Sequence, residues 1–73
     1  MNKSEKERWY NDVYRTHSPR LLRFVQRWVS EPQAHEIVQE IFLKLWQQDL
    51  AKVESHVKVW LFCCCRNRAI DYL

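Results

Sequence analysis

The sequence contains no glycine and only two prolines in 73 residues, and this restricts the possible folds more than any other feature. Tight β-hairpins favour glycine or asparagine because their turn residues need positive φ angles, whereas helices joined by short connections have no such need. Hydrophobic residues make up 47% of the chain and include four tryptophans, which supply the large apolar side chains that so small a core requires. The sequence therefore predicts one all-α domain over residues 1–73, a compact bundle of three to four helices.

Apolar side chains recur at helical spacing on both sides of a serine–proline pair. Before the pair they are Trp9, Tyr10, Val13 and Tyr14, and after it they are Leu21, Leu22, Val25, Trp28 and Val29. Ser18 and Pro19 are typical of an N-cap and a first helical position, which favours two helical segments bent at Ser18. The alternative is one continuous helix through Ser18 and Pro19. Three arginines lie off the stripe and are expected to face solvent: Arg20, Arg23 and Arg27.

The segment from Ser30 to about Gln48 has the clearest helical pattern. Ser30 can cap its start, Gln33 can complete a capping box, and Pro32 suits the first turn. The face expected to be buried consists of Ala34, Ile37, Val38, Ile41, Phe42 and Leu45. The opposite face consists of Glu36, Gln39, Glu40, Leu43, Lys44 and Gln47.

That opposite face is acidic. Glu40 and Lys44 form a favourable pair four residues apart, but Glu36 and Glu40 repel each other at the same spacing. Such a face is either simply solvated or kept acidic for a basic partner, and the residue pattern by itself leaves both interpretations open.

The last part of the chain predicts a loop followed by a helix. Residues 49–54 interrupt the helical period, and Ser55 is the expected cap of the helix that follows. The side chains expected to point inward are Val57, Trp60, Leu61, Cys64, Cys65 and Tyr72. Those expected to point wholly or partly outward are Lys58, Arg66 and Arg68. The helical pattern runs to the last residue without a C-cap, as expected of a truncated chain.

Charge is distributed unevenly along the sequence. Residues 1–30 contain seven basic and three acidic side chains, residues 31–50 one basic and four acidic, and residues 51–73 four basic and two acidic. An acidic central segment between basic flanks indicates surfaces for different partners.

The patterns of an enzyme or a metal site are missing from the sequence. There is no glycine-rich phosphate loop, no HExxH, and no Cys or Ser with a His at a suitable spacing. Three cysteines are consecutive, Cys63 to Cys65, and neighbours on a helix point about 100° apart, which disfavours a shared metal or a disulfide. We therefore expect packed thiols in a reducing cytoplasm, no catalytic residue, no metal and no cofactor. We also expect neither a secretory signal nor insertion into a membrane.

Four segments, taken in order, carry a family resemblance. Residues 14–24 are YRTHSPRLLRF, and residues 36–46 are EIVQEIFLKLW, close to the signature DLVQEVFLRLW. Residues 59–62 are VWLF, close to AWLF, and residues 66–73 are RNRAIDYL, close to RNLALDYL. In order and spacing these segments resemble region 2 of the sigma-70 family, specifically its extracytoplasmic-function (ECF) class. The resemblance implies a sigma factor domain that docks on RNA polymerase and recognises and opens the promoter minus-ten element.

The resemblance implies that the central helix docks on an arginine-rich coiled coil of the largest polymerase subunit. The matching positions are Glu36, Gln39 and Glu40, with Leu43 and Trp46 as apolar neighbours. Carboxylates can accept paired, charge-assisted hydrogen bonds from arginine, so such contacts would set orientation as well as attraction. An aromatic side chain at helical spacing is usually a core residue, and this is the alternative for Trp46.

The resemblance also implies that the last helix and the segment before it hold the non-template single strand of promoter DNA. The matching residues are Ser55 and His56 in the selectivity loop, Asn67 near a flipped base, and Lys58, Arg66 and Arg68 at phosphates. Unpairing a base costs a few kcal/mol, so the protein needs a positive groove for the freed strand. Basic helix faces are also commonly solvated without a ligand.

The chain departs from the family pattern at several positions. Glu36 stands where Asp is usual, Cys63 to Cys65 where Arg-Ile-Ala is frequent, and Arg68 where Leu is common. The helix-turn-helix domain of such factors has no counterpart in residues 1–73. An alternative function is a helical protein-interaction module, for a regulator or an oligomer, without DNA contact. An anti-sigma factor that covers the same surfaces is also compatible with the resemblance.

Overall fold

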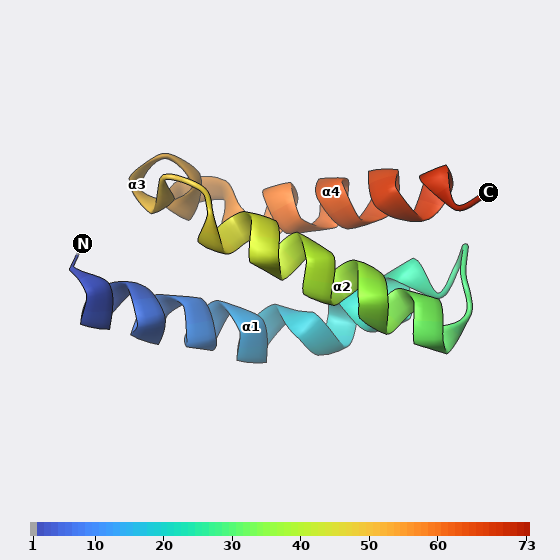
Figure 1. The fold of residues 1–73 in the computed structure, drawn as a ribbon, viewed down its shortest axis with the longest axis horizontal. Helices are drawn as coiled ribbons and strands as arrows, with labels where there is room; N and C mark the ends of the chain where they lie inside the picture. The colour runs from blue at the N-terminus through green and yellow to red at the C-terminus, as the bar shows by residue number, and fades with distance from the viewer. Residues whose placement is uncertain (1) are drawn as a thin grey trace.

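The computed structural model describes residues 2–73, and every regular element in that range is helical. Three helices form a bundle: α1 (Lys3–Val25), α2 (Glu31–Trp46) and α4 (Val57–Asp71). A short helix α3 (Leu50–Val53) and a 3-10 turn η1 (Glu54–His56) connect α2 to α4. α1 and α4 run in the same direction, and α2 crosses between them in the opposite direction (Figure 1). This arrangement confirms the predicted all-α bundle.

The first helix continues through the serine–proline pair, so the predicted break at Ser18 is wrong. Asn2 caps α1, whereas Ser18 is buried, with 8% of its surface exposed. An interior proline removes one backbone hydrogen bond and normally disfavours the helix. Here Leu21 and Val25 follow Pro19 in the helix, and both are fully buried against the rest of the bundle. Tertiary packing therefore outweighs the local preference for a break.

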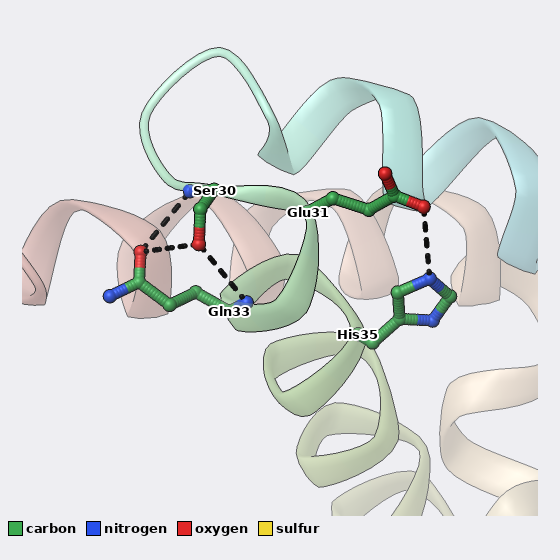
Figure 2. A network of polar contacts seen from close by, with 4 residues as sticks. All are labelled: Ser30, Glu31, Gln33 and His35. Carbon is green, nitrogen blue, oxygen red and sulfur yellow. Dashed lines mark hydrogen bonds and ion pairs between the residues drawn. The ribbon is translucent and has the colours of Figure 1, made fainter.

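The start of α2 follows the prediction. The Ser30 hydroxyl accepts a hydrogen bond from the Gln33 N–H at 3.4 Å, and the Gln33 side-chain oxygen accepts one from the Ser30 N–H at 3.1 Å. Figure 2 shows this reciprocal capping box at the end of the connection from α1. All six side chains expected to be buried on α2 are buried. Local sequence and tertiary packing agree in this helix.

The segment predicted as a loop is mostly helical, which corrects the prediction for residues 49–54. Asp49 caps α3, its side chain accepting a hydrogen bond from the Ala51 N–H at 3.2 Å. Leu50 and Val53, three residues apart, are both buried. One helical turn places these two side chains on the same side, where the bundle can cover them.

The start of α4 differs from the prediction as well. Ser55 lies inside the 3-10 turn, and His56 occupies the cap position without any side-chain capping bond. Because the chain is already helical before α4 begins, Ser55 does not have the extended backbone that a cap needs. At the other end of α4, Tyr72 is 39% exposed, and Ala69 is the buried residue. Leu61 and Cys65 point inward as expected, and Val57, Trp60 and Cys64 are half-buried.

The core lies along the crossing of α2 with its two neighbours. The fully buried side chains include Leu21 and Val25 of α1, Ile37, Ile41 and Leu45 of α2, and Leu61 and Cys65 of α4. The half-buried tryptophans Trp9, Trp28 and Trp60 pack against this core from outside. The large apolar side chains thus close a bundle that residues 2–73 form without a disulfide.

Replacing Ser30 by alanine tests whether the capping box contributes to stability. We expect Ser30→Ala to lower the free energy of unfolding by about 1 kcal/mol, because the first-turn N–H groups lose their partner. This corresponds to a decrease in Tm of roughly 4–8 °C for a domain of this size. Thermal denaturation followed by circular dichroism measures the difference. Ser55→Ala is the matched control and should change stability by less than about 0.5 kcal/mol. Equal losses in both variants would contradict the capping assignment.

Candidate functional site

One side of α2 presents the residues predicted to bind a basic partner. Glu36 and Gln39 are exposed, Leu43 is 64% exposed, and Glu40 and Trp46 are half-buried. At 3.6 residues per turn these five positions form a continuous strip opposite the buried face, with Glu40 toward α4 and Trp46 toward α1. We call this strip the α2 face. The structure brings all five residues together.

A groove between α1 and α2 extends this face. Its volume is about 410 Å³, and it is lined by Glu7, Tyr10, Asn11, Leu43 and Trp46. An adjoining hollow of about 230 Å³ is lined by Tyr10, Tyr14, Gln39, Phe42 and Leu43. We call the two together the α1–α2 groove. It places Leu43 and Trp46 of the α2 face next to aromatic side chains of α1.

Sequence reasoning missed the contribution of α1 to this surface. Glu7, Tyr10, Asn11 and Tyr14 recur at i, i+3, i+4 and i+7, which is the spacing of one helix face. The sequence contains that spacing, but Tyr10 and Tyr14 also belong to the apolar stripe of this segment, so the sequence does not show that they line a groove. In the structure Tyr14 is exposed and Tyr10 is half-buried.

Aromatic contacts hold the groove in shape. The Tyr10 hydroxyl donates a hydrogen bond to the Phe42 carbonyl at 2.8 Å. The Tyr10 ring packs edge-on against Trp46 with centroids 5.0 Å apart, and Tyr14 packs against Phe42 at 4.8 Å. Burial raises the pKa of Tyr10, and the neighbouring Tyr14 adds to the effect, so the hydroxyl keeps the proton that it donates. The walls of the groove are therefore ordered before any partner binds.

An ion pair joins α2 to α4 at the edge of the α2 face. The Arg68 Nε donates a hydrogen bond to a Glu40 carboxylate oxygen at 2.8 Å. The side chains are 34% and 41% exposed, and the Arg68 guanidinium also lies 4.8 Å from the centre of the Tyr72 ring. The hydrogen bond to Glu40 raises the pKa of Arg68 further above neutrality. Glu40 thus pairs across the bundle with Arg68 and not with Lys44, the partner expected from spacing along α2.

The residues predicted to contact DNA are spread around α4 and η1. Arg66 and Asn67 point outward, and the Arg66 guanidinium donates a hydrogen bond to the Asn67 side-chain oxygen at 3.3 Å. Ser55 and His56 are exposed in η1, their side chains 3.4 Å apart. Lys58 lines a cleft toward α1, while Arg68 faces α2. The structure therefore places Arg66 beside Asn67 and Ser55 beside His56. It separates Lys58, which faces α1, from Arg68, which faces α2.

A comparison with protein-family models matches residues 13–73 to Sigma-70 region 2. The chain belongs to the sigma-70 region 2 family. This is a family of transcription initiation factor domains and not of enzymes, which confirms both the sigma-70 resemblance and the prediction of a non-enzyme. Membership implies RNA polymerase core and promoter DNA as partners. Searches of curated proteins and of solved structures gave no match.

The family match covers α2 and α4 completely but begins within α1. Glu7, Tyr10 and Asn11, which line the α1–α2 groove, precede the matched residues. The sigma domain therefore builds part of this groove from a segment outside the family match.

The three cysteines of the sigma domain are free thiols at different depths. Cys63 is exposed, Cys64 is half-buried and Cys65 is buried. Burial raises the pKa of Cys64, and it raises the pKa of Cys65 to about 12. No group of metal-ligating side chains converges within residues 2–73. None of the helices described for the sigma domain is long and apolar enough to cross a membrane.

Thiol titration tests this gradient of burial. A thiol with a pKa of about 12 has a negligible thiolate fraction at pH 8, and the thiolate is the nucleophile. We therefore expect Cys63 to react first with a disulfide reagent at pH 8, and Cys65 to react only after unfolding. Absorbance at pH 8 with and without guanidinium chloride counts the thiols. Equal rates for all three thiols in the folded protein would contradict the burial of Cys65.

Proposed function

We propose that this sigma domain binds an arginine-bearing coiled coil of the largest RNA polymerase subunit through the α2 face and the α1–α2 groove. We further propose that η1 and α4 hold the non-template strand of the promoter minus-ten element. The motif resemblance supports the ECF class, with polymerase as the site of action in the cytoplasm. An anti-sigma factor that covers the α2 face would compete with polymerase for the same residues.

The proposal rests on one observation: Leu43 is an exposed apolar side chain that lies between the polar residues of the α2 face and the α1–α2 groove. Leu43 is 64% exposed and lies between Gln39 and Trp46 on the side of α2 that faces the groove. Apolar anchors surrounded by polar groups are typical of the centre of a protein interface. A partner helix with arginines could pair its guanidinium groups with Glu36 and Glu40 while its apolar atoms cover Leu43.

The Glu40–Arg68 pair connects the two parts of the proposed function. Glu40 belongs to the surface proposed for polymerase, and Arg68 to the surface proposed for DNA. A polymerase arginine that pairs with Glu40 would replace Arg68 as its partner. The released guanidinium could then bind a phosphate, so polymerase binding would favour DNA binding.

The outward side of α4 suits a single strand of DNA. Arg66 and Asn67 are exposed, and Val59 and Ile70 add exposed apolar surface on the same side of the helix. The Arg66 guanidinium can contact a phosphate, and the Asn67 amide can form hydrogen bonds with an unpaired base. Ser55 and His56 are exposed at the N-terminal end of this surface.

Polymerase binding can be tested with a substitution at Leu43. We expect Leu43→Ser to weaken binding to the coiled-coil segment of the largest subunit roughly tenfold, because a central apolar anchor is lost. Isothermal titration calorimetry measures the Kd. Val59→Ser is the matched control, because Val59 is also 64% exposed but lies on α4. Wild-type affinity for Leu43→Ser, or an equal loss for Val59→Ser, would argue against the proposed docking surface.

DNA recognition can be tested with a substitution at Asn67. We expect Asn67→Ala to weaken binding to a single-stranded oligonucleotide with the cognate minus-ten element by roughly three- to tenfold, the loss of about one hydrogen bond. Affinity for a scrambled oligonucleotide should stay unchanged, whereas Arg66→Gln should weaken binding to both. Fluorescence anisotropy gives the six affinities, those of the unmodified protein and of the two variants for each oligonucleotide. If the unmodified protein bound both oligonucleotides equally, specific recognition by α4 would be excluded, and the interaction-module alternative would gain support.

A further inference from the structure

Arg68 occupies a carboxylate that the α2 face would offer to a partner arginine. Its Nε donates a hydrogen bond to Glu40 Oε2 at 2.8 Å, and the two side chains form an ion pair between α4 and α2. The Arg68 side chain is 34% exposed and the Glu40 side chain 41%, so a partner can reach the pair from solvent. The free protein therefore already holds a guanidinium on Glu40.

An aromatic ring supports Arg68 in this position. The centre of the Tyr72 ring lies 4.8 Å from the central carbon of the Arg68 guanidinium. A ring face attracts a guanidinium, so Tyr72 at the end of α4 favours the position in which Arg68 reaches Glu40. A carboxylate and an aromatic ring thus form a guanidinium site, and the chain fills this site with its own arginine.

The other acid of the α2 face has no such partner. Glu36 lies one turn before Glu40 and is exposed. Among the residues that the structure describes, neither of the two ion pairs includes Glu36. Glu36 can therefore meet an incoming arginine directly, whereas Glu40 is free to do so only after its pair with Arg68 breaks.

One carboxylate does not serve two arginines equally well. A guanidinium binds a carboxylate best through two parallel hydrogen bonds, which need both oxygens. Arg68 bonds to Oε2 of Glu40, so a partner arginine would find Oε1 alone. Two guanidinium groups on one carboxylate would also repel each other, since a single negative charge faces two positive ones. A partner arginine therefore binds Glu40 most favourably when Arg68 leaves.

We propose that Arg68 is an internal competitor that lowers the affinity of the α2 face for its arginine-bearing partner. The observed affinity is reduced by the fraction of molecules in which Glu40 is free to bind. Exposed ion pairs are weak, and their range corresponds to an effect of about two- to fivefold in Kd. The inference rests on the proposed function for the identity of the partner, the coiled coil of the largest polymerase subunit.

The competitor is a departure of this chain from the motif that it resembles. The motif RNLALDYL has Leu at its third position, where RNRAIDYL of this chain has Arg68. A leucine carries no charge and cannot pair with Glu40. Arg68 thus determines how tightly the domain binds, although it lies on α4 and outside the α2 face.

Removing the competitor should raise the affinity. We expect Arg68→Leu to lower the Kd of the 73-residue chain for the coiled-coil segment about two- to fivefold, measured by isothermal titration calorimetry. Arg23→Leu is the matched control, because it removes the same charge from an exposed arginine of α1 that is in neither ion pair. It should change the Kd by less than about 1.5-fold, since salt screens a remote surface charge.

Circular dichroism checks that both variants are folded. An unchanged or higher Kd for Arg68→Leu would overturn the inference. An equal gain in Arg68→Leu and Arg23→Leu would overturn it as well, because the net charge and not the pair with Glu40 would then set the affinity.

The two acids of the α2 face give a sharper test. The gain from Arg68→Leu should disappear in a Glu40→Gln background, because this substitution removes the carboxylate for which the two arginines compete. The same gain should persist in a Glu36→Gln background. If the gain persists without the Glu40 carboxylate, Arg68 does not act through Glu40 and the inference is wrong.

The displacement of Arg68 can also be observed in the unmodified chain. A nitrogen–proton correlation spectrum shows the arginine Nε–H groups, and the signal that is missing in Arg68→Leu identifies Arg68. We expect the coiled coil to move this signal to its position in Glu40→Gln, where the hydrogen bond is absent. A signal that stays in place at saturating coiled coil would show that Arg68 remains on Glu40, contrary to the inference.

The Leu43 variant separates this inference from the proposed function. If Leu43→Ser loses affinity while Arg68→Leu binds as the unmodified chain does, the docking surface stands and the competitor is excluded. If Arg68→Leu gains affinity while Leu43→Ser loses none, the competitor stands and the proposed role of Leu43 fails. Absence of binding by both the unmodified chain and Arg68→Leu would overturn both.

Discussion

The packing of one face of α2 against α1 and α4 is the interaction on which the rest of the molecule depends. Ile37, Ile41 and Leu45 are fully buried there, and each such side chain contributes about 1.5–3 kcal/mol relative to an exposed position. The described chain has neither a disulfide nor a metal site, so the stability of the fold depends on this apolar packing. It also keeps α1 helical through Pro19, because the following turn packs into the same core.

Burying this face of α2 exposes the opposite one, and the bundle thereby presents a surface to a partner. The α2 face needs α1 to complete it, since Tyr10 and Tyr14 form the other wall of the groove. Edge-on aromatic contacts and the hydrogen bond from Tyr10 to the Phe42 carbonyl order that wall. Membership of the family implies polymerase and promoter DNA as partners. Polar and apolar side chains both line this groove, which suits the proposed contact with polymerase.

The same packing separates opposite charges onto different sides of the bundle. Glu36 and Glu40 lie on the α2 face. Three arginines and a lysine gather instead at a basic cleft between the end of α1 and the start of α4: Arg20, Arg23, Arg27 and Lys58. The Glu40–Arg68 pair lies at the boundary between the acidic and basic surfaces. Acidic and basic surfaces on different sides of a small domain favour partners of opposite charge on each side.

Local patterns in the sequence were enough to predict α2, its capping box and its buried face, because a cap and a helical stripe depend on residues within a few positions of each other. The ordered motifs also identified the sigma-70 family. The continuity of α1 at Ser18, the helical turn at residues 50–53 and the Glu40–Arg68 pair depended on the tertiary structure. Periodicity shows which side of a helix is apolar, but it does not show which neighbour covers that side. The groove and the basic cleft join residues of different helices, and only the packing of those helices decided which side chains meet.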